Sequence, residues 1–121
     1  MLLIMMNEIL TISIAEDSKE GERILQLDGP LTIKTLFDFR DAIRAEKTAK
    51  TVILDFSKVP YMDSAGVGAL VNAHVSCLNS SRRLALVAVQ DRIRTLMKVT
   101  HVEEVLKMYP TLQEARAAEA H

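Results

Sequence analysis

The sequence predicts an α/β fold, with a mixed, mainly parallel sheet of about five strands that carries about four helices. The hydrophobic period alternates along the chain between two residues, typical of strands, and 3.6 residues, typical of helices. A short β-branched run at residues 51–56 and a continuous apolar run at residues 84–89 are typical of strands buried in a parallel sheet. Because 121 residues suffice for only one hydrophobic core, we expect residues 1–121 to form a single domain.

The first two strands are predicted to form a hairpin. Residues 8–15 alternate between apolar and polar side chains, which is the period of a half-buried strand. A polar turn follows at residues 16–21, and a second strand is expected over residues 22–27. Two strands joined by so short a turn are antiparallel, so the sheet is mixed.

The middle of the chain reads as helix, strand and helix. Thr32 is placed to cap a helix over residues 33–46. The expected buried face of this helix consists of apolar residues three or four positions apart, namely Ile33, Leu36, Phe39 and Ile43. The central strand at 51–56 leads through a loop at 57–63 to a helix that begins at Ser64 and ends near Asn79.

Two more strands and two more helices follow. After the strand at 84–89, Asp91 is expected to cap a helix that runs through Lys98, and residues 105–109 form a short last strand. Thr111 and Glu114 form a capping box, which predicts a terminal amphipathic helix over residues 112–120.

Composition and charge exclude several classes of partner. Lys and Arg number 15 against 16 Asp and Glu, a formal net charge of −1, so we expect no direct binding to nucleic acid. The apolar start, Met1–Met6, has no basic leader and is interrupted by Asn7 and Glu8, so we expect neither export nor membrane insertion. A cytoplasmic protein is the simplest expectation. Cys77 is the only cysteine, which excludes an intrachain disulfide, and its apolar surroundings predict a buried thiol.

Ser64 is the residue with the most informative surroundings. It follows Asp63 at the start of a helix, after a central strand, and the carboxyl edge of an open α/β sheet is where function tends to lie. Ser64 is either a plain helix cap or a phosphate acceptor, because a helix start offers free N–H donors and a partial positive charge. Gly66 and Gly68, which lack a Cβ, allow another backbone to approach closely. Asp63 can orient the hydroxyl for a kinase.

Catalytic and cofactor sites are not expected. The serine hydrolase motif Gly-x-Ser-x-Gly is absent, because Ser64 follows Asp63 and Met62. His74 is expected to be a packed residue at the edge of an apolar helix face, and His101 lies in a loop. No Walker loop or dinucleotide fingerprint occurs, and neither histidine has a companion at metal-ligand spacing. We therefore expect no catalytic residue, metal or cofactor.

The segment Met62-Asp-Ser-Ala-Gly-Val-Gly-Ala-Leu70 resembles the signature of STAS domains of the anti-sigma factor antagonist family. The resemblance extends over nearly the whole chain, through the segments 27–32, 52–57 and 112–115. It implies a STAS fold and a partner switch. The unmodified antagonist would bind an anti-sigma factor that is also a serine kinase, the kinase would phosphorylate Ser64 and release it, and a serine phosphatase would reset it.

The resemblance also implies a partner-binding surface. Its expected members lie in the two loops that flank the sheet edge, namely Asp28, Thr32, Met62, Asp63, Ser64 and Gly66. Thr32 stands where such proteins commonly carry an acidic residue that contacts the kinase, so partner identity is open and Thr32 can equally be a plain cap. The alternatives are a STAS module of a stress-sensing or lipid-transport complex, and an α/β domain that binds a small ligand or is an enzyme.

Overall fold

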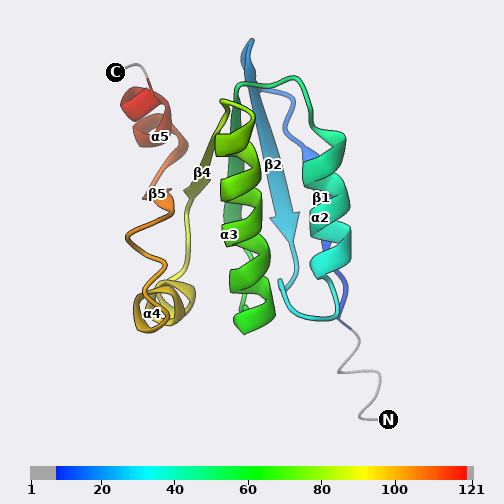
Figure 1. The fold of residues 1–121 in the computed structure, drawn as a ribbon, viewed down its shortest axis with the longest axis vertical. Helices are drawn as coiled ribbons and strands as arrows, with labels where there is room; N and C mark the ends of the chain where they lie inside the picture. The colour runs from blue at the N-terminus through cyan, green and yellow to red at the C-terminus, as the bar shows by residue number, and fades with distance from the viewer. Residues whose placement is uncertain (1–7, 120–121) are drawn as a thin grey trace.

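The computed structural model describes residues 8–119, so the predictions for Met1–Met6 and for Ala120 lie outside the described residues. One five-stranded sheet forms the centre of the fold (Figure 1). Its strands lie side by side in chain order: β1 (Thr11–Ile14), β2 (Glu22–Asp28), β3 (Thr51–Lys58), β4 (Arg83–Val87) and β5 (Lys107–Tyr109). β1 pairs with β2 antiparallel and the other pairs are parallel, which confirms the predicted mixed sheet.

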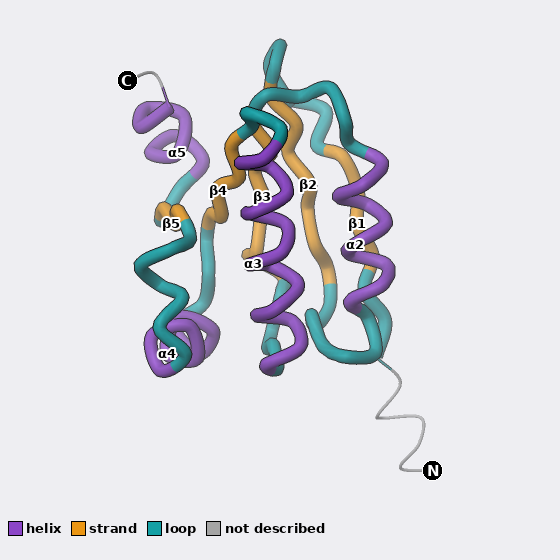
Figure 2. Tube along the Cα trace, viewed as in Figure 1, coloured by secondary structure: helices purple, strands orange, loops and turns teal. Residues whose placement is uncertain are grey.

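The described helices cover the two faces of the sheet unequally. They are α2 (Leu36–Ala45), α3 (Ser64–Asn79), α4 (Asp91–Val99) and α5 (Leu112–Glu119). The main core lies on one face, where side chains of α2, α3 and α4 pack against the sheet. Figure 2 shows α2 and α3 side by side in front of the strands. A smaller cluster on the opposite face contains Ala115 and Leu112 of α5 with alternate residues of β2, β3 and β4. None of the described helices is long and apolar enough to cross a membrane.

β3 shows why the sheet has this centre. Val52, Leu54 and Phe56 point into the main core, while Ile53 joins the smaller cluster. All four are fully buried because a core cluster covers each face of the sheet, while β2 and β4 pair with the strand on both sides. The central position predicted for this strand is confirmed.

Two predicted helix caps are wrong. α2 begins at Leu36 with Thr35 as its N-cap, because Thr32 and Thr35 form a separate turn. In that turn the Thr32 N–H donates to the Thr35 hydroxyl, which itself donates to the Pro30 carbonyl. α4 has Gln90 as its N-cap, and Asp91 is its first helical residue, where its charge favours the helix dipole. Thr111 does accept the Glu114 N–H at 3.1 Å, as the capping box predicts.

Three strands are shorter than predicted. β1 covers 11–14 rather than 8–15. β4 ends at Val87 because Ala88 adopts a φ of +57°, a left-handed conformation that no strand continues through. β5 begins only at Lys107, since residues 103–105 form a turn. Cys77 is buried in the core, and burial raises the pKa of its thiol.

Candidate functional site

The loops that follow β2 and β3 meet at the carboxyl edge of the sheet, the lower end in Figure 1. Leu31 and Met62 form a parallel β-bridge that extends the pairing of the two strands. The Leu31 N–H donates to the Tyr61 carbonyl at 3.2 Å, and the Asp63 N–H donates to the Leu31 carbonyl at 3.4 Å. The two loops therefore form one surface, as the sequence predicted.

Asp63 links this surface together with both of its carboxylate oxygens. Oδ1 accepts the Gly66 N–H at 2.9 Å, which makes Asp63 the N-cap of α3. Oδ2 accepts the Ile33 N–H at 3.1 Å, from the other loop. Because Asp63 is the cap, the alternative that Ser64 serves as the helix cap is wrong.

Ser64 is the first residue of α3 and is exposed. Its hydroxyl makes no hydrogen bond to any residue within 8–119. A side chain with no structural bond to lose is available for modification. The positive end of the α3 dipole is close to it, and it can accommodate a negatively charged group.

Gly66 allows the close backbone approach that was expected of it, and the approaching backbone is the chain's own. A Cβ at Gly66 would lie 2.2 Å from the Leu31 carbonyl oxygen, so its lack of a side chain lets the chain's own β2–α2 loop pack on α3. Gly66 is buried under that loop. A Cβ at Gly68 would meet nothing within 4 Å, so no close approach explains this second glycine.

The remaining predicted residues divide between surface and interior. Asp28 is exposed at the end of β2. Met62 belongs to the hydrophobic core. Thr32 is only 4% exposed, and its hydroxyl donates to the Glu8 carboxylate at 3.0 Å. In this structure Asp28 and Ser64 face solvent, Asp63 is half-buried, and Thr32, Met62 and Gly66 lie beneath them.

Sequence reasoning missed three residues at this edge. Glu8 accepts hydrogen bonds from Thr32 and from the Tyr61 hydroxyl, and the bond to Glu8 raises the pKa of the Tyr61 phenol. Ile33 was expected on the buried face of a helix, but its side chain is 60% exposed because it lies in the turn before α2. Glu8 is 24 residues from Thr32 and 53 from Tyr61, and no local pattern reports pairs so distant in sequence.

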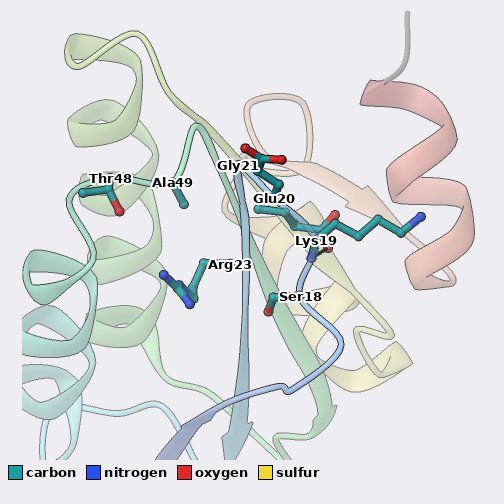
Figure 3. Close-up of a pocket in the computed structure, with 8 residues that line it drawn as sticks. Ser18, Lys19, Glu20, Gly21, Arg23, Thr48 and Ala49 are labelled. Carbon is teal, nitrogen blue, oxygen red and sulfur yellow. Dashed lines mark hydrogen bonds between the residues drawn. The ribbon is translucent and has the colours of Figure 1, made fainter.

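No other described group converges on Ser64 to form a catalytic or metal site. His74 is ten residues further along α3, about 15 Å at the helical rise of 1.5 Å per residue. Within residues 8–119, no three His, Cys, Asp or Glu side chains are placed to hold a metal ion. A cavity of about 300 Å³ lies at the opposite sheet edge, lined by the β1–β2 turn and by Thr48 and Ala49 (Figure 3).

Comparison with known proteins shows the family. The sequence model of the STAS domain matches residues 13–115. The chain belongs to the STAS domain family. This STAS domain is 24% identical over 102 residues to the anti-sigma-B factor antagonist of Listeria monocytogenes, which covers 82% of the chain and 90% of that relative.

Solved structures share the fold. An anti-sigma factor antagonist from Mycobacterium paratuberculosis matches with a TM-score of 0.78 and 21% identity, over 91% of this chain and 93% of that one. The phosphorylated form of the Bacillus cell fate determinant SpoIIAA matches with a TM-score of 0.66 and 18% identity, over 89% of this STAS domain and 98% of its own chain.

Proposed function

We propose that this STAS domain is an anti-sigma factor antagonist that acts by partner switching. The unphosphorylated form binds an anti-sigma factor that is also a serine kinase. Phosphorylation of Ser64 by that kinase releases the domain, and a serine phosphatase restores the unmodified form. The kinase supplies the ATP site, and this chain acts as its substrate and regulator without catalysis of its own.

The observation that carries the proposal is the environment of Ser64. Its hydroxyl is exposed at the start of α3 and bonds to no residue that the structure describes, while Asp63 takes over the capping. A kinase can therefore reach the hydroxyl without unfolding the helix. The name of the Listeria relative supports an antagonist function. The SpoIIAA structure in its phosphorylated form is an example of another protein with this fold that is phosphorylated.

The surface around Ser64 suits a protein partner. Ile33, Tyr61 and Phe37 are large exposed apolar side chains on or next to the two loops, and clustered apolar residues often mark a binding surface. Asp28 and the Glu8 carboxylate add negative charge at the same edge. Because Thr32, Met62 and Gly66 of the predicted set are buried, we propose that Asp28, Asp63 and Ser64 contact the partner together with Glu8, Ile33 and Tyr61.

Phosphate on Ser64 would weaken such an interface by charge and bulk. A phosphoserine carries about −1.5 to −2 charges near neutral pH. The interface, shaped for a small hydroxyl, would have to accept this group beside Asp63, where like charges are costly to bring together. The domain itself tolerates the charge because it lies at a helix N-terminus.

Intact-mass spectrometry tests the modification. The purified protein is incubated with each candidate anti-sigma factor kinase and ATP, and one phosphate is expected. Ser64→Ala should abolish the mass increase, whereas Ser57→Ala, at a second exposed serine of the same sheet edge, should retain it. Phosphate on Ser64→Ala, or none on the wild type with any kinase, would contradict the proposal.

Titration calorimetry against the cognate kinase tests the switch. Ser64→Ala should bind like the wild type, Ser64→Asp should bind more weakly, and the phosphoprotein most weakly. The aspartate has a smaller effect because it adds one charge and fewer acceptor oxygens than phosphate. Equal affinity of the phosphorylated and unmodified forms would end the partner-switching hypothesis.

A further inference from the structure

A furrow runs between α2 and α3, from Leu36 and Ala69 to the C-terminal ends of both helices, and its lining does not include Ser64. It consists of two adjoining hollows of about 330 and 370 Å³, which share Ile43, Arg44 and Ser76. The two helices lie side by side on one face of the sheet, so the furrow follows their common length (Figure 1). Along α3 its lining extends from Ala69 to Ser80, about three helical turns.

The furrow has an apolar floor and polar rims. Its floor is made by apolar side chains of both helices, namely Leu36, Phe39, Ile43, Ala69 and Ala73. On the α2 side the rim carries Arg40 and Arg44, and on the α3 side it carries Asn72 and Ser76. Both hollows are open to solvent, so a small ligand bound there would keep much of its surface exposed, unlike a ligand in a typical small-molecule pocket.

Apart from Glu46, which pairs with Arg23, the charged side chains that line the furrow are basic. Arg40, Arg44 and Lys47 are exposed and form no ion pair with any residue between 8 and 119. The carboxylates of α2, Asp38 and Asp41, lie off the furrow. The basic character of this surface therefore arises from how charges are arranged around the helix, since the whole chain is nearly neutral.

The far end of the furrow has an unused guanidinium nitrogen. Arg82 donates from Nε to the Ala49 carbonyl at 2.7 Å, but its Nη2 is buried and has no acceptor in the described part of the chain. Glu46, the acidic residue of the lining, is already engaged by Arg23 at 2.7 Å and by the Ala49 N–H. No carboxylate in the furrow is left to neutralise Arg44, Lys47 or Arg82.

We propose that the α2–α3 furrow docks an acidic amphipathic helix of a partner protein. Apolar side chains of that helix at positions i, i+3, i+4 and i+7 would enter the floor. Its Asp or Glu residues would pair with Arg40 and Arg44. Three turns of open furrow match the length over which such a helix presents one apolar face. This binding does not involve Ser64 and stands independently of the partner switch.

A designed peptide provides the test. The probe is a fluorescein-labelled helical peptide of about 17 residues with Leu at i, i+3, i+4 and i+7 and Glu on the flanking positions. Its binding to the full chain is followed by fluorescence anisotropy. Arg40→Glu with Arg44→Glu should weaken binding by roughly tenfold or more, because attraction becomes repulsion. Arg92→Glu with Lys98→Glu, at exposed cations of α4, changes the net charge equally and should leave binding nearly unchanged.

A steric variant separates docking from mere charge attraction. Ala69→Phe fills the floor without altering charge and should also weaken the peptide, while Ser64→Ala should not. Circular dichroism melts establish that each variant is folded. Equal weakening by the α4 control pair, or no peptide binding by the wild type, overturns the proposal. Arginine-dependent binding to phosphatidylglycerol vesicles in place of the peptide would assign the furrow to a lipid surface and also overturn it.

Discussion

Asp63 organises the site at the scale of single residues. One oxygen of its carboxylate caps α3 through Gly66, and the other holds the Ile33 N–H of the neighbouring loop. The hydroxyl of the adjacent Ser64 is therefore not needed to cap the helix. A helix cap contributes about 1 kcal/mol, and the second bond adds an amount of the same order.

Substitution of Asp63 should separate these two contributions. Asp63→Ala loses both acceptors, and we expect the free energy of unfolding to fall by roughly 1–3 kcal/mol. Asp63→Asn keeps one carbonyl oxygen for the cap but has none for Ile33, so its loss should be about 1 kcal/mol or less. Urea denaturation measures both. Equal losses in the two variants would mean that the cap contributes nothing.

The contact between the β2–α2 loop and α3 positions the site at the scale of elements. Leu31 bridges to Met62, and its carbonyl oxygen lies against the backbone of Gly66. The exposed face of the loop and the start of α3 are therefore held in one arrangement by buried backbone contacts. A side chain at Gly66 would force them apart.

The two glycines of α3 provide a matched pair. Gly66→Ala places a Cβ against the Leu31 carbonyl and should destabilise the protein by about 1–3 kcal/mol, typical of overpacking. Gly68→Ala meets open space and should stabilise the helix by roughly 0.5–1 kcal/mol. Thermal unfolding of both variants checks this, and partner affinity should fall only for Gly66→Ala. A stabilising Gly66→Ala would refute the assigned contact.

At the scale of the whole molecule, α5 is tied to the far end of the sheet. Arg116 pairs with the buried carboxylate of Glu22 at 2.7 Å and donates to the Asp17 carbonyl. The hydrogen bond from Arg116 holds the pKa of Glu22 below its ordinary value. This ion pair fastens the helix that covers the second face of the sheet.

This ion pair predicts a dependence of stability on pH. Because the pKa of Glu22 is lowered in the folded state, its contribution is fully present above the ordinary carboxyl pKa of 4.5 and is lost as pH falls below it. Arg116→Met should cost about 1–3 kcal/mol at pH 7 and less near pH 3. Urea denaturation at both pH values measures the difference. An equal cost at the two values would show that the charge of Glu22 is irrelevant.

Phosphorylation should leave the whole fold intact. The phosphate lies at the N-terminus of α3, where the helix dipole favours negative charge. We expect the melting temperature to change by no more than about 4 °C, equivalent to roughly 1 kcal/mol for a domain of this size. Differential scanning calorimetry of phosphoprotein and wild type measures the change. A loss of cooperative unfolding would mean that release proceeds through unfolding rather than through the interface.

The sequence by itself predicted the order of strands and helices, the parallel centre of the sheet and the start of α3 at Ser64. These features follow from the hydrophobic period of short stretches of sequence and from the apolar residues of β3, which are visible without the tertiary structure. It also placed the two site loops at one sheet edge, because parallel strands end on the same side.

Only the tertiary structure decided which residue caps which helix and which site residues face solvent. The sequence suggests Thr32 as a helix cap, but its N–H donates to the Thr35 hydroxyl and its own hydroxyl donates to the Glu8 carboxylate. The Thr35 hydroxyl in turn donates to the Pro30 carbonyl. The bond between Asp63 and Gly66 that caps α3 spans only three residues, but the second carboxylate oxygen of Asp63 accepts the N–H of Ile33, 30 residues away. The Asp63–Ile33 and Thr32–Glu8 contacts join residues distant along the chain, so they depend on how the loops meet and not on any local pattern.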